Sequence, residues 1–410
     1  MPTPPIPATR PAPTLPDELI EEVFLRLPPD EPSSLVRASL ASSFWLGLLT
    51  GTSFSVRYRE FHDAPPMLGF FYSWLHADRP ADEGEPPVQR FAFTTKFGAR
   101  IPEVEEWDDY EALDCRHGRV LFENPFGCPA PLFVWDPMTG CTRYLEKPDG
   151  CWGDGATVVC AVSGCDHRLC DGGPVRVVFF TTGDDDGCVA HVSVALLEMD
   201  DAWSESSDLD LELEWTLSTG LELEARHAFI PEILSPVLIK DALYFMLSIV
   251  DGVRDMAILK YDMASDGLSL IDLPDVRSNG LPLKDHSFIP MAMGDGNLGF
   301  AQVDGLTLNL WSSSIQTGVE GLASWTQHRV VDLKNLLPIR NPKQSLRLIG
   351  SVEGSDIIFV TTDLGIYQIS LMSLGWKKLW KSEKFSALIP YMSFYNPQGS
   401  IKTLSVVYYT

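Results

Sequence analysis

The side chains best suited to bind a metal ion are Cys160, Cys165, His167 and Cys170, which lie close together in the sequence. Thiolate and imidazole groups are the ligands that Zn²⁺ prefers. The C-x4-C-x4-C spacing differs from that of the usual zinc finger or knuckle, and no C-x-x-C pair accompanies it. We therefore interpret the cysteines as free thiols of a reducing compartment, placed on strands and turns. We expect no metal and no cofactor.

Groups that could carry out catalysis are not arranged in any recognised pattern. The sequence contains no G-x-S-x-G nucleophile elbow, no phosphate-binding loop, no H-E-x-x-H motif and no dinucleotide fingerprint. The eight histidines are scattered without ligand spacing, and none can be assigned as the base of a nucleophilic cysteine. We assign no catalytic residue and predict that the protein is not an enzyme.

The overall charge and hydrophobicity restrict the partners that this chain can have. A net charge of −25 argues against binding to nucleic acid, which needs a basic surface. A hydrophobic content of 45% is that of a folded protein. No apolar run approaches 18 residues, so we expect no membrane-spanning helix. Residues 1–13 are rich in proline and are predicted to be a disordered leader, not a signal peptide.

The most strongly patterned stretch is residues 15–49, LPDELIEEVFLRLPPDEPSSLVRASLASSFWLGLL. Its first part has the apolar spacing of one helix face, at Leu15, Leu19, Ile20, Val23, Phe24 and Leu27. Thr14 and Asp17 predict a capping box, with Pro16 in the first turn. The pair Pro28–Pro29 ends this helix.

Two more short helices are predicted after it. The second begins after Pro32 with Ser33 or Ser34 as its N-cap, and the third ends at Gly51. Three short helices bury too little surface to close a core of their own. The segment therefore either docks on the rest of the chain or is completed by a partner protein that covers its apolar face.

At these residues the chain resembles an F-box, and the continuation SFSVRYREFHDAPPMLGFF is similar to the segment that follows the F-box in the large grass family of plant F-box proteins. The resemblance implies binding to the Skp-type adaptor of an SCF (cullin-RING) ubiquitin ligase, and through it to a cullin. It also implies a C-terminal domain that holds a protein client. Carried over by position, the adaptor-facing residues are Leu15, Pro16, Leu19, Ile20, Val23, Leu27, Pro28, Leu35, Arg37, Ala38 and Trp45.

The sequence departs from that family around its tryptophan. Family members usually carry a cysteine and basic residues there, whereas this chain has Ser42, Ser43 and Phe44 before Trp45, and then Leu46 and Gly47. We predict that the apolar side of the interface is kept and that its basic complement is largely lost. This loss motivates a second hypothesis, a protein-interaction scaffold that has lost its connection to the ligase.

After the F-box, residues 50–62 are predicted to form a further helix with Tyr58 and Phe61 turned inward, and residues 63–66 to form a linker. From residue 67 onward, short β-branched and aromatic runs alternate with turn residues. Units of three strands recur about every 50 to 65 residues, a repeat of roughly kelch length. They begin at Met67, Gly118, Val175, Ala242, Asn297 and Asp356.

These repeats predict an α+β multidomain protein. A small all-α domain of three to four short helices, residues 14–62, precedes a large all-β domain, residues 67–410, which is a β-propeller of about six blades. Seven blades or an open β-sandwich are the alternatives. Residues 391–410 are expected to close the ring. The motifs WDPMTG, YDMASDG and SLGW are expected to form the turn between the last two strands of a unit, with Gly or Asp at positive φ.

The sequence thus predicts a substrate receptor for ubiquitin-dependent degradation, acting in the cytoplasm, the nucleus or both. Such a receptor acts by position, because holding the client raises the effective concentration of its lysines near the ligase. The expected client anchors are three loop tryptophans, Trp107, Trp152 and Trp203. A propeller hydrolase is a third hypothesis, since a chance pair of acids in the channel could mimic a glycosidase dyad.

Overall fold

The computed structural model describes the chain over residues 15–74, 91–94, 110–124, 131–138, 141–148, 155–162, 165, 170, 173–184, 188–199, 215–223, 227–230, 235–251, 253–274, 287–315, 323–343, 346–381 and 385–395. The predicted leader, residues 1–13, lies outside these ranges. The described residues fall into two compact units. One contains the residues up to Pro66 together with Phe394 and Tyr395, and the other spans Met67–Ser393. The domain limits given above stay predictions.

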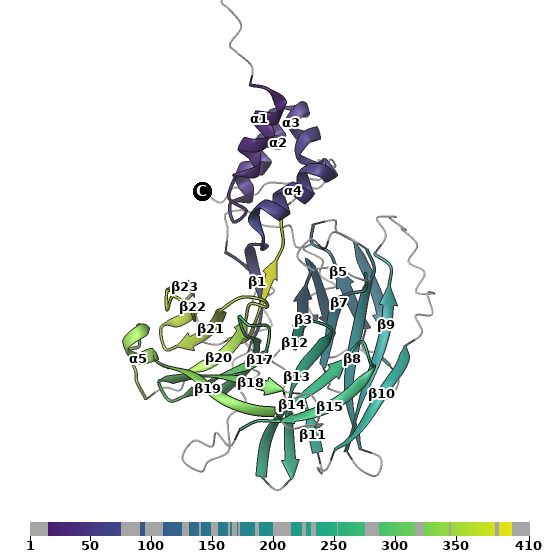
Figure 1. The fold of residues 1–410 in the computed structure, drawn as a ribbon, viewed down its shortest axis with the longest axis vertical. Helices are drawn as coiled ribbons and strands as arrows, with labels where there is room; N and C mark the ends of the chain where they lie inside the picture. The colour runs from purple at the N-terminus through teal and green to yellow at the C-terminus, as the bar shows by residue number, and fades with distance from the viewer. Residues whose placement is uncertain are drawn as a thin grey trace, which may run out of the picture. The chain divides into compact units, whose positions relative to one another are not determined.

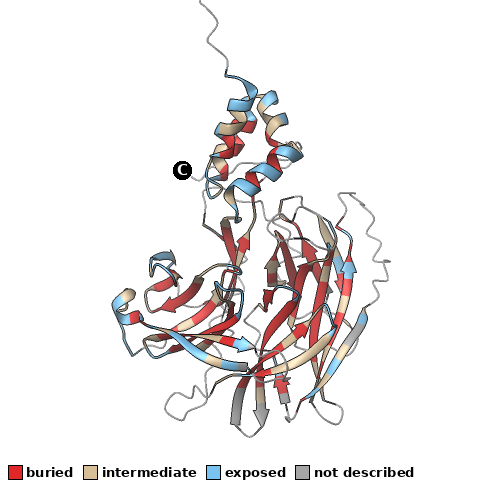
Figure 2. Ribbon diagram, viewed as in Figure 1, coloured by how far each residue is buried: buried red, intermediate tan, exposed pale blue. Residues whose placement is uncertain are grey.

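The helical unit contains α1 (Asp17–Leu25), α2 (Pro32–Ala41), α3 (Ser43–Leu49) and α4 (Thr52–His62). Its larger buried apolar side chains from the helices come from all four of them (Figure 2) and are Phe24, Leu25, Leu35, Val36, Leu49, Phe54 and Tyr58. The predicted helices are therefore confirmed. No helix in the described part of the chain is both long enough and apolar enough to cross a membrane.

The starts of the first two helices differ from the predicted ones. Pro16 is the N-cap of α1 and makes no side-chain cap hydrogen bond. Thr14 of the predicted capping box lies outside the described residues. In α2 the proline is the first helical residue and Glu31 is the N-cap, in place of Ser33 or Ser34. Proline fits the first helical position because its φ is already helical and its missing N–H has no intrahelical partner there.

The β unit consists, over its described residues, of six antiparallel sheets, here called blades 1 to 6 (Figure 1). Blade 1 joins both ends of the unit, with β1 (Met67–Trp74), β2 (Phe91–Phe93) and β24 (Phe385–Met392). Blade 2 contains β3 (Glu111–Arg116), β4 (Arg119–Glu123), β5 (Pro131–Trp135) and β6 (Thr142–Glu146). Blade 3 contains β7 (Gly155–Cys160), β8 (Val175–Asp184), β9 (Cys188–Leu197) and β10 (Thr216–Leu223).

The second half of the β unit repeats this plan. Blade 4 contains β11 (His227–Phe229), β12 (Val237–Ile239), β13 (Ala242–Asp251), β14 (Val253–Asp262) and β15 (Gly267–Asp272). Blade 5 contains β16 (Phe288–Ala292), β17 (Leu298–Asp304), β18 (Thr307–Ile315) and β19 (Ala323–Asp332), followed by the short helix α5 (Leu333–Leu336). Blade 6 contains β20 (Arg347–Ser351), β21 (Ile357–Thr362), β22 (Gly365–Ser370) and β23 (Trp376–Trp380).

The blades form a closed ring. Blade 2 contacts blades 1 and 3 through β3, which lies against β24 and β7. Blades 3 and 4 meet through β8 and β11, and blade 5 contacts blades 4 and 6 through β16, which lies against β12 and β20. Blade 6 contacts blade 1 through β20 and β24. The ring is closed by β24, which pairs with β1 so that Phe70 lies opposite Pro390. This closing strand begins earlier than the predicted segment, residues 391–410. Pro390 is tolerated because an edge strand leaves one row of N–H groups outside the sheet. The predicted six-bladed propeller is thus confirmed.

Apolar cores lie between neighbouring blades. Each of the six clusters found in the described β unit joins two adjacent blades, because strands of a propeller bury both faces. Phe180 of blade 3 stacks on Phe245 of blade 4 with ring centroids 5.3 Å apart. Burial on both faces explains why β4 is buried at every position, with the apolar run Val120-Leu121-Phe122 at its centre.

In blades 2, 5 and 6 the predicted three-strand units coincide with the second to fourth strands, and in blade 4 the unit coincides with β13, β14 and β15. The units beginning at Met67 and Val175 contain only two described strands each, β1 and β2 in blade 1 and β8 and β9 in blade 3. The inner strands β3, β7, β12, β16 and β20 were missed. The three turn motifs do lie between the last two strands of their blades. In YDMASDG the positive φ belongs to Asp266, as expected. In SLGW it belongs to Leu374, where a glycine or aspartate was predicted.

Candidate functional site

The predicted adaptor-facing residues divide into exposed, half-buried and buried sets. The exposed residues are Leu15, Pro16, Leu19, Val23, Pro28 and Arg37, and the half-buried ones are Ile20, Leu27 and Trp45. Leu35 and Ala38 are buried in the helical unit. Their side chains therefore pack inside this unit, and they can support an interface but do not present a surface to it.

One row of large apolar side chains on α1 faces solvent, and we call it the α1 row. It consists of Leu15, Leu19 and Val23, whose side chains are 59%, 50% and 55% exposed. Leu19 and Val23 are four residues apart and therefore lie on one side of the helix, and Leu15 directly precedes the N-cap Pro16. The core of the unit uses the neighbouring positions Phe24 and Leu25 instead. An apolar row of this kind is a surface that another molecule can cover.

Packing and ion pairs fix the orientation of α1. Phe24 meets the half-buried Trp45 edge to face, with ring centroids 5.4 Å apart. On the surface, Arg57 of α4 lies 2.5 Å from Glu21 and 2.9 Å from Glu22 of α1. A hydrogen bond from Arg26 lowers the pKa of the Glu22 carboxyl, with a further contribution from Arg57.

The C-terminal end of α1 is held by side chains of α4. Tyr58 donates its hydroxyl hydrogen to the carbonyl of Leu27 at 2.9 Å, and Nε2 of His62 donates to the carbonyl of Leu25 at 2.9 Å. These bonds satisfy carbonyls that have no partner within the helix. Burial, with some help from Asp30, raises the pKa of Tyr58 well above its usual value. The prediction that Tyr58 turns inward is confirmed, whereas Phe61 is 54% exposed, so that prediction is wrong.

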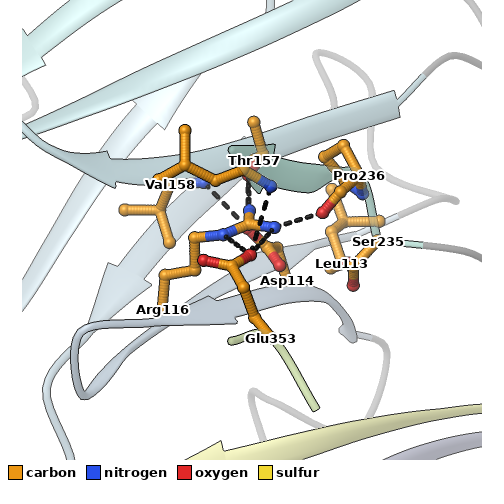
Figure 3. Close-up of polar contacts among 9 residues, drawn as sticks. Leu113, Asp114, Arg116, Thr157, Val158, Ser235, Pro236 and Glu353 are labelled. Carbon is orange, nitrogen blue, oxygen red and sulfur yellow. Dashed lines mark hydrogen bonds and ion pairs between the residues drawn. The ribbon is translucent and has the colours of Figure 1, made fainter. Parts of the chain in front are cut away.

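The β unit contains a buried charge cluster around Arg116 (Figure 3). Its guanidinium donates through Nε to Glu353 at 2.7 Å and through one terminal nitrogen to Asp114 at 2.5 Å. It also donates to the hydroxyl of Thr157 and to the carbonyl of Pro236. These partners belong to blades 2, 3, 4 and 6, so a single side chain ties four blades together.

The cluster is almost closed to solvent. The side chains of Arg116 and Asp114 are 5% and 2% exposed, whereas that of Glu353 is 34% exposed. Burial alone would lower the pKa of Arg116, but Asp114 and Glu353 outweigh it and raise that pKa, so the guanidinium stays charged. Burial raises the pKa of Asp114, opposed by Arg116. The buried Asp114 carboxylate accepts hydrogen bonds from Arg116, from the hydroxyl of Thr157 and from the N–H of Val158.

Three of the four side chains that were considered as zinc ligands, and for which no metal was predicted, come together in blade 3. The sulfur atoms of Cys160, Cys165 and Cys170 all lie within 4.8 Å of one another. Burial raises the pKa of the Cys160 and Cys170 thiols. His167, the fourth member of the sequence group, lies outside the described residues. So do Trp107, Trp152 and Trp203, so the client anchors stay predictions.

Two features of these sites were missed by sequence reasoning. The Asp114-x-Arg116 spacing places two charges on one face of a strand, which could have indicated the cluster. Nothing in the sequence links them to Glu353. The convergence of the three cysteines follows from the pairing of β7 with β8, which no local motif reveals.

The geometry defines a class of protein: a small helical module with an uncovered apolar row, joined in one chain to a six-bladed β-propeller. Comparison with protein families gives the particular module. The F-box domain model matches residues 13–55, which include α1, α2, α3 and the first part of α4. The chain therefore carries an F-box domain at its N-terminal end.

Comparison with curated proteins returned no match. Among solved structures, the chain is similar to one from a nidogen/laminin complex, with 10% identity, a TM-score of 0.36, and coverage of 80% of this chain and 98% of that one. Similarity to a puromycin-hydrolyzing peptidase of Mycobacterium tuberculosis has 12% identity, a TM-score of 0.35, and coverage of 67% of this chain and 38% of that one. The chain is also similar to the WD40 domain of SCAP from fission yeast, with 13% identity, a TM-score of 0.29, and coverage of 67% of this chain and 55% of that one.

Proposed function

We propose that this protein is the substrate-receptor subunit of an SCF-type cullin-RING ubiquitin ligase. The observation that carries the proposal is the coincidence of the F-box match, residues 13–55, with the solvent-facing α1 row. Burying a Leu or Val side chain contributes about 1.5–3 kcal/mol. Leu19 and Val23 on one helix, with Leu15 just before it, form an anchor for an adaptor protein with an apolar groove.

The adaptor of this proposal is a Skp-type protein, which in turn binds a cullin. The half-buried Trp45 lies against Phe24 and supports the same helix. The exposed Arg37 on α2 is a basic residue of the predicted interface that remains accessible to an acidic partner surface. Rim charges of this kind mainly set the association rate and its salt dependence, while apolar anchors supply most of the affinity.

The propeller of this proposal holds a protein client. In that role it carries out no chemistry and acts by raising the local concentration of client lysines near the ligase. The tryptophans Trp107, Trp152 and Trp203 remain the predicted anchors. The plant, grass-type assignment and a cytoplasmic or nuclear location likewise stay predictions.

Size-exclusion chromatography of purified components tests the proposal. The full chain is mixed with a Skp-type adaptor and the N-terminal domain of a cullin, and the fractions are resolved on a gel. We expect the three proteins to elute together, and the cullin to separate from the chain when the adaptor is left out. Elution of the chain apart from the adaptor at moderate salt would contradict the proposal and favour the scaffold without a ligase connection.

A further inference from the structure

The three cysteines of blade 3 belong to one hairpin. Cys160 is the last residue of β7 and pairs with Val175, the first residue of β8. Cys165 and Cys170 lie in the connection between these strands. Their sulfur atoms are 3.1 Å apart, and both lie within 4.8 Å of the sulfur of Cys160. The strand pairing thus brings three thiols to a single point at the end of the hairpin.

We propose that Cys160, Cys165 and Cys170 form a zinc-binding site. Zn–S bonds of about 2.3 Å in a tetrahedral arrangement place sulfur atoms about 3.8 Å apart. The sulfur atoms of Cys165 and Cys170 are closer than this, and no pair in the group is more than 4.8 Å apart, so small rotations of the side chains are sufficient. Three soft thiolate ligands favour Zn²⁺ over Mg²⁺ or Ca²⁺. A fourth ligand, such as water, completes the tetrahedron.

Backbone hydrogen bonds already shape this connection for binding. The N–H of Val162 donates to the sulfur of Cys160 at 3.4 Å, a contact that stabilises a negatively charged sulfur. The N–H of Cys165 donates to the carbonyl of Val162 at 3.3 Å, and the N–H of Ala161 donates to the carbonyl of Pro174 at 3.0 Å. Both ends of the connection are therefore fixed before an ion enters.

A metal ion can reach this site from solvent, and its binding needs no further reactant. All three cysteines are half-buried, so an ion can reach the sulfurs from solvent. On binding, each thiol proton passes to solvent or buffer while a Zn–S bond forms, and no electrons are transferred. A disulfide between Cys165 and Cys170 would instead need an oxidant and would leave Cys160 without a role. We therefore assign the group to metal binding.

Cobalt(II) titration of the full chain tests the site. The protein is reduced, freed of metal and titrated without oxygen, and the near-ultraviolet sulfur-to-cobalt absorption is recorded before Zn²⁺ is added in competition. We expect one ion per chain with the spectrum of a tetrahedral thiolate site, displaced by zinc. Replacing Cys160, Cys165 or Cys170 by Ser should weaken binding by more than about 100-fold, since even outer-shell changes cost about 10- to 100-fold.

Cys141→Ser is the matched control, because Cys141 is another half-buried cysteine and lies in blade 2. It should bind cobalt as the wild type does. Alkylation mapped by mass spectrometry gives a second readout that needs no variant: zinc should protect the three cysteines and leave Cys141 unchanged. Absence of the sulfur-to-cobalt band, equal binding by all the variants, or a Cys165–Cys170 disulfide that persists in reductant would each overturn the proposal.

Discussion

Nε of Arg116 lies 2.7 Å from the carboxylate of Glu353, a residue 237 positions further along the chain. The same guanidinium binds Asp114 beside it in β3. Blades 2 and 6 are therefore linked by a charge pair across the ring, in addition to the apolar cores between neighbouring blades. Because both carboxylates depend on one cation, the cluster is expected to act as a unit.

Replacing Arg116 by Met should lower the free energy of unfolding by about 3–5 kcal/mol, because it leaves the buried Asp114 carboxylate without its cation. Urea denaturation at neutral pH measures the change. Arg176→Met is the control, since Arg176 of β8 is only partly buried, and it should cost less than about 1 kcal/mol. Equal decreases in the free energy of unfolding for the two variants would show that the buried cluster does not stabilise the fold more than a partly buried arginine does.

Gly350→Ala should destabilise the ring where blade 6 meets the closing strand. A Cβ at Gly350 would lie 2.3 Å from the carbonyl oxygen of Leu388 in β24, and a backbone atom cannot move aside cheaply. We expect a loss of about 2–3 kcal/mol in thermal or urea unfolding. Gly294→Ala, where a Cβ meets nothing within 4 Å, should be nearly neutral. An unchanged stability of Gly350→Ala would argue against the contact of β20 with β24.

Phe394→Ala should loosen α4. Phe394 follows the last strand, is buried and meets the ring of Tyr58 at a centroid distance of 6.0 Å. Removing a buried Phe side chain costs about 3–5 kcal/mol, so hydrogen exchange of the α4 amides should become faster. Phe61→Ala removes an exposed ring of the same helix and should leave that exchange unchanged. Identical protection in both variants would exclude a role for the C-terminal residues in the helical unit.

Asp262 should make stability depend on acid pH. Bonds from Ser265 and Lys260 lower the pKa of this carboxyl from 3.8 to about 2. The ionised form therefore stabilises the native state fully above about pH 4, and this contribution is lost as the pH falls through about 2. After solvent screening we expect about 1 kcal/mol or less. The free energy of unfolding of Asp262→Asn, measured with denaturant, should be lower than that of wild type at pH 5, and the two values should converge near pH 2. The same difference at both pH values would be inconsistent with this account.

Sequence patterns predicted the features that depend on local spacing and turn chemistry. The motif YDMASDG marks the turn between β14 and β15, where Asp262 and Asp266 both accept hydrogen bonds. The inner strands were not predicted because they lack such markers, and β12, Val237–Ile239, has only three residues. Turn residues reveal where a hairpin is, but a short buried strand is recognised only by its neighbours in the sheet.

Long-range relations were not predictable. The apolar spacing of α1 predicted one continuous face, yet Phe24 points into the core while Leu19 and Val23 face solvent. Periodicity locates an apolar side but does not say which molecule covers it. The link from Arg116 to Glu353 likewise depends on the closure of the whole ring.

The most direct test of the proposed function is a titration of the full chain with a Skp-type adaptor by isothermal calorimetry. The chain is compared with Leu19→Asp/Val23→Asp, which changes two exposed residues of the α1 row, and with Val330→Asp, which changes an equally exposed residue of β19. We expect wild type and Val330→Asp to bind alike, and the double variant to lose at least about 100-fold in affinity while keeping its helical circular dichroism. Equal binding by all three proteins, or no binding by wild type, would contradict the assignment of the α1 row as the adaptor interface.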